Sequence, residues 1–397
     1  MTAAGPLAGI RVLDLGQYIA GPSAAQSLSD LGANVIKVES LTGDQTRGIG
    51  AFGDSMMRAF NRDKRSVALD LAHETGNAIM HRLLEDADVL IQNFRVGSAE
   101  RLGLGADELM ERYPGLIYAS ITGFGTRGPS KARPGLDIAA QAEFGMMHTT
   151  GVADGEPQRV GFHAVDTAAA NALVTGILAA LFTRTTTGRG THVETSLMES
   201  ALAVQAAAWG EFTVTGVAPR RKGNGQPYAA PAADTFEASD GTIVISAYTP
   251  QKWSALCTLI GRPDMIDDPR FVDNPARVAN RPAMVAAINE AFVDRTRDQA
   301  VELLLEAGIV AGAVRSFDEI AKDKDVLASG VLVDVAGPDG SSFTSPGLPF
   351  TLDGRRRTTS TSAPKLGQHT SSLLADLGFS PAEIDDLIAS RVVVATN

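Results

Sequence analysis

Short apolar runs alternate with helical stretches along roughly the first 125 residues of the chain. Several of these runs are rich in Val, Ile and Leu, as buried parallel strands are. The expected strands lie at residues 10–15, 35–38, 67–71, 89–91 and 116–121. Between them, apolar residues return every three or four positions, which predicts helices. Because short apolar strands separated by helices need crossover connections, we expect an α/β domain with a doubly wound parallel sheet.

The pattern changes in the second part of the chain. Asp166 precedes TAAANALVTGILAALFTR, a segment that is apolar almost all round and ends before Gly188, so we expect a helix buried on most sides. After a polar linker at 220–226 (RRKGNGQ), shorter strands and helices predict a smaller α+β domain. The expected domains are 1–220 (first part of the large domain), 228–320 (small domain) and 325–397 (a C-terminal part that returns to the large domain).

Composition places the chain among ordinary globular proteins and narrows its partners. Of 397 residues, 44% are hydrophobic and 20% charged, enough to bury a core. The net charge of −11 argues against a nucleic-acid partner, because phosphate binding needs a basic face. The single Cys257 cannot form an intramolecular disulfide and offers no metal cluster. With no apolar run of ~20 residues and no basic leader, we expect a soluble, cytoplasmic protein.

Two features resemble a dinucleotide-binding fold but fail on inspection. Residues 123–128 match G-x-G-x-x-G, yet Pro129 follows and no helix opens to receive a pyrophosphate. Glu39 lies where such folds place a ribose-binding acid, but the turn after the first strand (LGQYIAGPSA) has no glycine fingerprint. An NAD-dependent oxidoreductase is therefore disfavoured.

Asp166 is the main candidate for chemistry. Its place before the long helix suits an N-cap, which is worth ~1 kcal/mol. The same place suits a nucleophile, since the N–H groups of the helix start favour an ionised carboxylate. A carboxylate that attacks an acyl carbonyl splits a difficult exchange into two easier steps. The residues alone leave both roles open.

The stretch 157–200 (PQRVGFHAVDTAAANALVTGILAALFTRTTTGRGTHVETSLMES) resembles the core signature of the class III (CaiB/BaiF-type) CoA-transferases. Collinear blocks similar to this family cover essentially the whole chain. They include AGPSAAQSLSDLGANVIKVESLTGDQTR (20–47), NRDKRSVALDL (61–71), ADVLIQNFRVGSAERLGL (87–104), YASITGFGTRGP (118–129), PGLDIAAQAEFGM (134–146) and APKLGQHTSSLLADLG (363–378).

The resemblance implies a Rossmann-like large domain, a small α+β domain and a homodimer of interlocked rings. It implies acyl-CoA and a carboxylic acid as substrates, with no tightly bound cofactor. It places the nucleophile at Asp166, which would form an acyl anhydride and then an aspartyl-CoA thioester.

The family's CoA-contacting positions carry over by motif. They fall on Gln17, Ile19 and Ala20 in the first turn, on Leu69, Asp70, Leu71 and Ala72 after the third strand, and on Asn93, Phe94 and Arg101. An arginine suits CoA, which carries several phosphate charges, because a guanidinium pairs with phosphate in a bidentate manner. An exposed helix position is the plain alternative for Arg101.

Two further positions also follow from the resemblance. Asp137 in PGLD matches a second acidic residue near the thioester, although a turn or cap residue explains it equally well. The segment Gly223, Asn224, Gly225 and Gln226 is similar to a mobile glycine loop that covers the site. Glycines allow close backbone approach, as a lid that excludes water needs, but also suit a linker turn.

Some positions depart from the family or separate its branches. Ser40 stands where transferases carry an arginine, and Ala170 where a glycine often occurs, which puts cofactor contacts in doubt. An α-methylacyl-CoA racemase would need a histidine at Leu136 and a glutamate at Thr249, and neither residue present can shuttle a proton. A non-catalytic CoA-binding protein is the other alternative. The donor and acceptor acids are not determined by the sequence.

Overall fold

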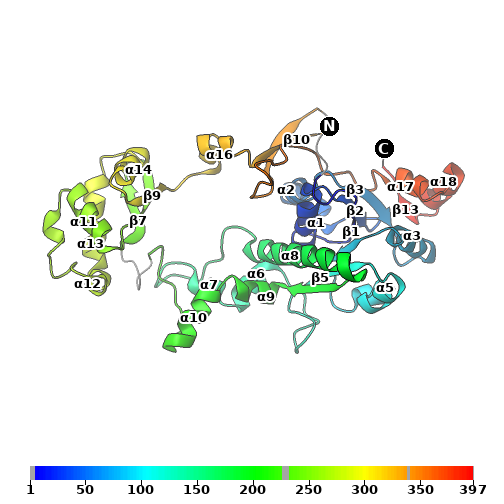
Figure 1. Cartoon of the computed structure of the whole chain (residues 1–397), viewed down its shortest axis with the longest axis horizontal. Helices are drawn as coiled ribbons and strands as arrows, with labels where there is room; N and C mark the ends of the chain where they lie inside the picture. Colours follow the sequence, from blue (N-terminus) through cyan, green and yellow to red (C-terminus); the bar gives the residue numbers. More distant parts are fainter. Residues whose placement is uncertain (1–4, 226–231, 338–339, 397) are drawn as a thin grey trace. The chain divides into compact units, whose positions relative to one another are not determined.

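The computed structural model describes residues 5–225, 232–337 and 340–396 (Figure 1). The chain divides into two compact units. Unit 1 comprises Met1–Phe144, Val160–Gly210 and Asp325–Asn397, and unit 2 comprises Gly145–Arg159 and Glu211–Lys324. Each unit has its own sheet and its own core.

Unit 1 is built on a seven-stranded sheet with the order β13-β3-β2-β1-β4-β5-β6. Its strands are β1 (Arg11–Asp14), β2 (Asn34–Glu39), β3 (Arg65–Leu69), β4 (Val89–Gln92), β5 (Ile117–Thr122), β6 (His192–Ser196) and β13 (Val393–Val394). All neighbours are parallel except β13, which pairs antiparallel with β3. The order 3-2-1-4-5-6 of the first six strands is that of a doubly wound Rossmann-like sheet, as predicted.

Helices cover both faces of this sheet (Figure 1). On one face, α3 (Glu74–Leu84), α5 (Ala106–Arg112), α17 (Thr370–Asp376) and α18 (Pro381–Ala389) close a core with β1 to β5 and β13. On the other face, α1 (Ala20–Asp30) packs against α8 (Ala164–Thr187). The other helices of this unit are η1 (Gln45–Gly48), α2 (Gly50–Phe60), α4 (Ser98–Arg101), α6 (Asp137–Glu143), α9 (Leu197–Ala203) and α16 (Lys324–Ser329). The strands are buried on both faces, which is why they read as continuous apolar runs.

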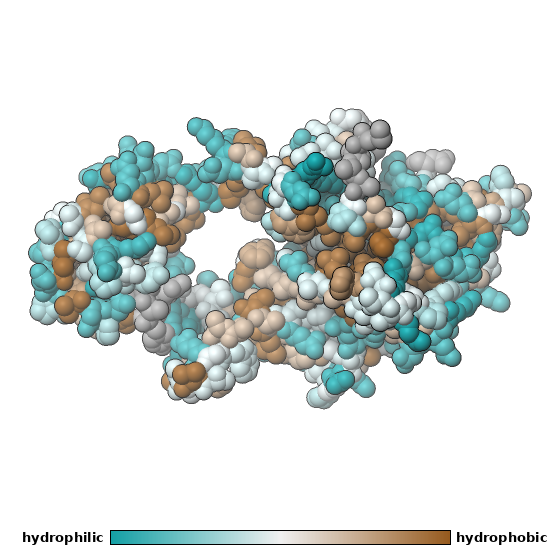
Figure 2. Space-filling model, viewed as in Figure 1, coloured by the Kyte–Doolittle hydropathy of each residue, from teal (hydrophilic) through white to brown (hydrophobic). Residues whose placement is uncertain are grey.

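Helix α8 is less buried than its sequence suggested. One stripe, including Leu173 and Ile177, packs inward, whereas Phe182 is 76% and Leu178 36% exposed. Figure 2 shows hydrophobic residues gathered on the face of unit 1 over this helix. The expectation that no segment reaches membrane-spanning length was also wrong, because α8 is long and apolar enough by composition. The 18-residue apolar window of α8 is 39% buried, and the helix contacts α1, β5 and β6.

The C-terminal segment of unit 1 returns to the sheet through elements that the apolar pattern missed. A small sheet with the order β11-β10-β12 forms from β10 (Leu332–Ala336), β11 (Ser342–Pro346) and β12 (Thr359–Thr361). Its attachment is polar: the Thr361 N–H donates to Asp63 Oδ1 at 2.7 Å, and Arg357 forms an ion pair with the same carboxylate at 3.1 Å. Contacts of this kind leave no periodic apolar signal.

Unit 2 holds an antiparallel sheet of β7 (Ala233–Ala238), β8 (Gly241–Ser246) and β9 (Val310–Ala313). Its helices are α7 (Met146–Thr149), α11 (Pro250–Leu259), η2 (Pro263–Met265), α12 (Asn274–Ala279), α13 (Arg281–Phe292), α14 (Arg297–Glu306) and α15 (Phe317–Ile320), and α10 (Ala206–Thr215) connects to it from unit 1. Phe236, Trp253 and Phe292 are almost fully buried in its core.

Candidate active site

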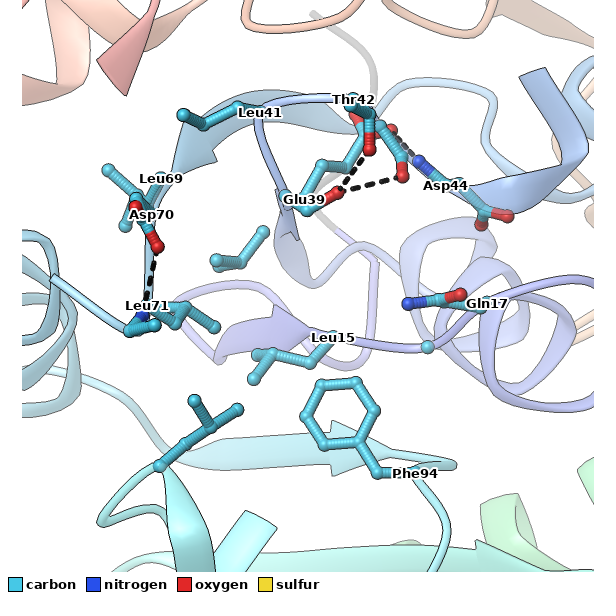
Figure 3. Close-up of a pocket in the computed structure, with 16 residues that line it drawn as sticks. Leu15, Gln17, Glu39, Leu41, Thr42, Asp44, Leu69, Asp70, Leu71 and Phe94 are labelled. Atoms are coloured by element: carbon cyan, nitrogen blue, oxygen red, sulfur yellow. Dashed lines mark hydrogen bonds between the residues drawn. The ribbon is translucent and has the colours of Figure 1, made fainter. Parts of the chain in front are cut away.

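A cavity of about 440 Å³ lies at the carboxyl ends of β1 to β4 in unit 1 (Figure 3). Leu15, Phe94, Leu41, Leu69 and Leu71 surround it, with Gln17 and Asp70 on opposite sides. Its other lining residues are Gly16, Val38, Glu39, Ser40, Thr42, Gly43, Asp44, Ala72 and Leu102. In open α/β sheets, ligands bind beyond the carboxyl ends of the strands, where the strand order reverses. Here that reversal falls between β1 and β4.

The turn after β1 and the turn after β4 are tied together at this reversal point. The Gln17 N–H donates to Asn93 Oδ1 at 2.9 Å, and Asn93 Nδ2 donates to the Gln17 carbonyl at 2.9 Å. Gly16 has no space for a side chain, since a Cβ would come within 2.8 Å of Asp14 Oδ1. Tyr18 has a left-handed φ of 61°, and its N–H donates to Asp44 Oδ1 at 3.2 Å. The wall of the cavity is therefore fixed before any ligand enters.

Behind this turn lies a buried charge cluster of Asp14, Lys37, Asp44 and Lys64. Lys64 Nζ donates to Asp14 Oδ2 at 2.7 Å, and Lys37 Nζ donates to Asp44 Oδ2 at 2.9 Å. All four residues are at most 3% exposed. Burial lowers the pKa of Lys64 to about 8. Burial also opposes ionisation of Asp44, but the charge of Lys37 and the hydrogen bonds to Asp44 outweigh burial, so the pKa of Asp44 is lowered. Each buried carboxylate of the cluster thus has its own ammonium partner.

Glu39 belongs to the same charged region and is not free for a ligand. Its oxygens accept hydrogen bonds from Arg47 at 2.7 and 2.9 Å, from the Asp44 N–H at 3.0 Å and from Ser66 Oγ at 2.7 Å. Burial opposes its ionisation, but the Arg47 hydrogen bonds outweigh burial and lower the pKa of Glu39. Because both Glu39 oxygens already accept hydrogen bonds from the protein, Glu39 has no oxygen left to bind a ribose hydroxyl. This agrees with the sequence-based rejection of Glu39 as a ribose-binding acid.

The predicted CoA-contacting residues fall into two groups. Six line the cavity: Gln17, Leu69, Asp70, Leu71, Ala72 and Phe94. Asn93 does not line the cavity but is hydrogen-bonded to Gln17, which does. Ile19 and Ala20 are buried at the start of α1. Arg101 is exposed on α4 beside the cavity residue Leu102, and its Nη2 donates to Ser98 Oγ at 2.7 Å. Their CoA-binding roles stay a prediction.

Sequence reasoning missed the segment after β2 as part of this cavity. Ser40, Leu41, Thr42 and Gly43 line it, although Ser40 had been noted only as a departure from the family pattern. The missed signal is positional: the segment follows a central parallel strand, as the predicted turns after β1 and β3 do.

A second group of residues lies at the start of α8. The helix begins at Ala164, so Asp166 is in its first turn and does not cap it. Of the two roles that the sequence left open for Asp166, the structure therefore excludes the N-cap. None of the described residues donates a hydrogen bond to the Asp166 carboxyl oxygens.

Asp137, the first residue of α6, takes the capping position instead. Its Oδ2 accepts the Val165 N–H at 2.8 Å and the Asp166 N–H at 3.1 Å. Its Oδ1 accepts a hydrogen bond of 2.5 Å from Gln141 Nε2. Asp137 is only 5% exposed. The structure thus brings together Asp137 and Asp166, which the sequence had named separately, and adds Gln141, which it had not.

The carboxyl group of Asp166 is not held in its ionised form. Burial, helped by the neighbouring charge of Asp137, raises its pKa from 3.8 to about 7. The expectation that the helix N-terminus keeps this carboxylate ionised was wrong, because Asp137 has taken the free N–H groups. The result is a carboxyl group that exchanges its proton close to neutral pH.

Exposed apolar side chains surround this helix start. Leu136 and Ile138 flank Asp137 and are 57% and 54% exposed, and Phe162 is 63% exposed. The Phe52 ring lies 5.9 Å from the ring of His163, the residue before α8. A substrate or partner that covered these side chains would also exclude water from Asp166.

The described part of the predicted glycine loop is anchored within unit 2. The Gly223 N–H donates to the Gly151 carbonyl at 2.9 Å, and Asn224 Nδ2 donates to Thr235 Oγ1 at 3.3 Å. Gly225 approaches the Asp234–Arg281 ion pair so closely that a Cβ would come within 2.7 Å of Arg281 Nη2. Gln226 lies outside the described residues. A lid function of this loop stays a prediction.

Comparison with known proteins agrees with the fold and the motifs. The chain matches the model of CoA-transferase family III over residues 7–370. Acetyl-CoA:oxalate CoA-transferase of Acetobacter aceti is 38% identical over 355 residues, covering 88% of this chain and 90% of that protein. Succinyl-CoA:glutarate CoA-transferase of Mus musculus is 32% identical over 394 residues, covering 98% of this chain and 90% of that protein. The crystal structure of a CaiB/BaiF family protein from Brucella suis is similar with a TM-score of 0.85 at 35% identity, covering 94% of this chain and 99% of that chain.

Proposed function

The chain belongs to CoA-transferase family III, and from this premise we propose that it moves CoA from an acyl-CoA to a free carboxylic acid through covalent intermediates on Asp166. The observation that carries the proposal is the carboxyl group of Asp166, which no described residue uses for structure and whose pKa lies at about 7. A group of this kind is ionised often enough at neutral pH to attack, and is more basic than an ordinary carboxylate.

The first half of the reaction transfers CoA to the enzyme. An Asp166 carboxylate oxygen attacks the thioester carbonyl, the C–S bond breaks, and CoA leaves as a thiolate while an acyl-aspartyl anhydride forms. The thiolate then attacks the aspartyl carbonyl of the anhydride. The donor acid leaves as a carboxylate, and Asp166 becomes a CoA thioester.

The second half repeats these steps with the acceptor. The acceptor carboxylate attacks the aspartyl thioester and forms a new anhydride, again with CoA as the thiolate. The thiolate attacks the acceptor's acyl carbonyl, which produces the new acyl-CoA and restores the Asp166 carboxylate. Each bond that breaks is matched by one that forms, so no further reactant is required.

The cavity beyond β1 to β4 supports CoA as the substrate. Its walls combine apolar side chains such as Leu15, Leu71 and Phe94 with the polar residues Gln17 and Asp70. Sites for cofactor-sized ligands have this mixture of apolar surface and few polar groups. The lining contains no Lys or Arg, so we propose that the charged phosphates lie outside the cavity, near the exposed Arg101 on α4.

Mass spectrometry of the trapped enzyme tests the covalent route. An acyl-CoA donor added without acceptor should increase the mass of the peptide that contains Asp166, and hydroxylamine should convert this adduct. Asp166→Ala should give no adduct. The matched control is Asp107→Ala, which removes an exposed carboxylate from the first turn of α5 and should leave adduct formation unchanged. Failure to detect any adduct in the wild type, together with kinetics that require both substrates at once, would refute the route.

A panel of acids identifies the substrates. The named relatives act on oxalate and glutarate with acetyl-CoA and succinyl-CoA as donors, and we propose small carboxylic acids of this class as the first to test. CoA exchange between each donor and acceptor, followed by mass spectrometry, gives the answer directly. Exchange with none of them would move the search to larger acyl groups.

The racemase alternative lacks its acid and base. Leu136 is an exposed apolar residue, and the Thr249 hydroxyl caps α11 by accepting the Lys252 N–H at 3.3 Å. Since a positioned acid or base contributes roughly 10²–10⁴-fold each, α-proton exchange should be slower by about 10⁴–10⁸-fold than in a competent site. Incubation of a 2-methylacyl-CoA in deuterated water checks this. Rapid deuteration with inversion, and no CoA transfer, would favour the racemase.

The homodimer predicted from the family resemblance is kept as part of the proposal. Its support is the exposed apolar surface of a single chain, including Phe182 on α8 and Trp209 on α10, which is 48% exposed. Apolar patches of this kind mark interfaces. Light scattering should show a dimer at micromolar concentration, and a stable folded monomer there would contradict it.

A further inference from the structure

Gln141 lies one turn after Asp137 on α6 and is fully buried, with an exposed fraction of 0%. Its Nε2 donates to Asp137 Oδ1 at 2.5 Å, and its Oε1 accepts the Val160 N–H at 2.8 Å. Its Nε2 also lies 3.5 Å from the Phe162 carbonyl. The side-chain amide therefore links α6 to the segment that leads into α8.

This link determines which carboxylate binds the start of α8. A helix start offers several free N–H groups, and a first-turn aspartate such as Asp166 could fold back onto them. In this structure Asp137 accepts the N–H groups of Val165 and Asp166. Gln141 holds the other oxygen of Asp137 and so fixes the carboxylate in that position. The Asp166 oxygens are left without a helix hydrogen bond.

We propose that Gln141 is a positioning residue for the transfer reaction: it fixes the carboxylate of Asp137 on the first turn of α8 and thereby keeps the Asp166 carboxyl group free for covalent chemistry. The inference rests on the proposed function of Asp166 and goes beyond it, because it assigns a role to a residue that contacts neither substrate nor nucleophile. Its amide is buried and is hydrogen-bonded to Asp137 on one side and to the Val160 N–H on the other, as expected of a residue that holds another in place.

The charge environment of Asp166 supports this assignment. The elements packed against α8 are α1, α6, α9, β5 and β6. They carry Asp30, Asp137, Glu143, Tyr118, His192, Glu194 and Glu199 as titratable residues. Of these, only Asp137 acts on Asp166 by its charge, and together with burial it raises the pKa to about 7. A change in the position of Asp137 must therefore appear in the pH dependence of Asp166.

Two substitutions of Gln141 should shift that dependence in opposite directions. Gln141→Met keeps the volume but removes the hydrogen bonds of the side-chain amide, so Asp137 is released and the pKa of Asp166 loses the part of its rise that is due to the charge of Asp137. Gln141→Glu adds a third carboxyl group beside Asp137, which raises the pKa of Asp166 further. The measurement is the single-turnover rate of adduct formation on Asp166, from about pH 5 to about pH 9.

We expect the wild-type rate to increase through a midpoint near pH 7, where Asp166 loses its proton. In Gln141→Met the midpoint should move to lower pH, and the maximal rate should fall by roughly ten- to a hundredfold because the carboxylate is no longer placed accurately. In Gln141→Glu the midpoint should move to higher pH. KM for the acyl-CoA should change little in either variant, since Gln141 does not line the cavity.

Gln26 provides a matched control. It is a glutamine only 4% exposed on α1, and its Nε2 donates to Asp30 Oδ1 at 3.0 Å, also across one helical turn. Gln26→Met should leave the midpoint and the maximal rate of adduct formation unchanged, and urea unfolding measures how much stability each substitution costs. If Gln141→Met does not fold, the upward shift in Gln141→Glu still decides the question.

The outcomes separate this inference from the function on which it rests. No adduct in the wild type would mean that the covalent route itself is wrong. An adduct in the wild type, with unchanged midpoints in both Gln141 variants, would overturn the positioning role alone. Equal losses of rate in the Gln141 and Gln26 variants, without opposite shifts, would reduce Gln141 to a structural residue.

Discussion

Two groups of carboxylates in unit 1 are held in opposite ways. In the buried charge cluster behind the cavity, Asp14 and Asp44 each have a lysine partner within 2.9 Å. At the start of α8, Asp137 and Asp166 lie together, and none of the described residues forms an ion pair with either; the pKa of Asp166 rises to about 7. The first arrangement stabilises the ionised form of these carboxylates and holds the turn that forms the cavity wall in place. The second makes ionisation of one carboxyl group unfavourable, so that it exchanges its proton near neutral pH, as the proposed reaction needs.

The comparison also shows how a fold separates stability from reactivity. A buried charge without a partner is costly, so most buried acids in this chain are paired or fully hydrogen-bonded, as Glu39 is. Asp166, which is partly buried, accepts no side-chain or backbone hydrogen bond from the described residues, and helix α6 maintains this state by supplying Asp137 to the helix start. Four tests examine the contrast, from the largest expected effect to the smallest.

Asp166→Asn should show the largest effect. The substitution retains the shape of the side chain but removes the nucleophilic oxygen, so CoA exchange should fall by at least roughly 10³-fold, as for other essential nucleophiles. Steady-state exchange with the active donor and acceptor measures it, and circular dichroism verifies the fold. Exchange at close to the wild-type rate in a folded variant would disprove the role of Asp166.

Lys64→Met tests the paired group. Removal of the ammonium leaves Asp14 buried without its partner, which should cost about 3–5 kcal/mol of unfolding free energy. Urea unfolding measures this loss. The double variant Asp14→Asn/Lys64→Met should recover most of it, since no buried charge then remains unpaired. A single variant as stable as the wild type would show that the cluster does not depend on this pair.

The pH dependence of stability tests the unpaired group. The folded-state pKa of Asp166, about 7, lies above its ordinary value of 3.8. Its contribution to stability is therefore fully present below about pH 3.8 and is lost as the pH rises through about 7. Asp166→Asn removes this loss, so the variant should equal the wild type near pH 4 and exceed it at pH 8 by about 1–3 kcal/mol.

Unfolding free energies of both proteins at several pH values provide the comparison. Identical pH dependence would show that Asp166 is ordinarily ionised in the folded chain, and would remove the electrostatic half of the contrast.

Arg11→Met should show the smallest effect. Arg11 forms an ion pair with Asp86 at 3.1 Å, but the Asp86 side chain is 75% exposed. Surface pairs of this kind contribute about 0.2–1 kcal/mol. Urea unfolding at low and high salt should therefore show a small loss that salt removes. If Arg11→Met lost as much unfolding free energy as Lys64→Met, burial would not explain why the Lys64–Asp14 pair is expected to contribute more than the Arg11–Asp86 pair.

The sequence predicted the central sheet well because its strands are buried on both faces. The strands β1, β2, β4 and β5 follow the predicted apolar runs closely. It missed β6, in which exposed and partly buried residues alternate, and the small sheet of β10, β11 and β12, which is attached by polar contacts such as Thr361 to Asp63. Strands at an edge or in a thin sheet have no continuous apolar run, so their pattern resembles a loop.

For the site, the sequence located residues but not their relations. Asp166 and Asp137 were named from motifs, and six of the ten proposed CoA-contacting residues line one cavity. The helix start was placed too late, because His163 and Ala164 have no cap signature that a sequence pattern could detect. Gln141 carried no signal at all, since a glutamine on a short helix is ordinary until its buried contacts are known.

The sequence by itself determined the central strands β1 to β5, the family and the candidate aspartate, because these depend on local apolar patterns and on motifs. The tertiary structure alone decided the state of that aspartate. Asp137 and Asp166 are 29 residues apart, and only folding brings the Asp137 carboxylate to the start of α8 and partly buries Asp166. A pKa depends on solvation and on neighbouring charges in space, and neither quantity can be read along a chain.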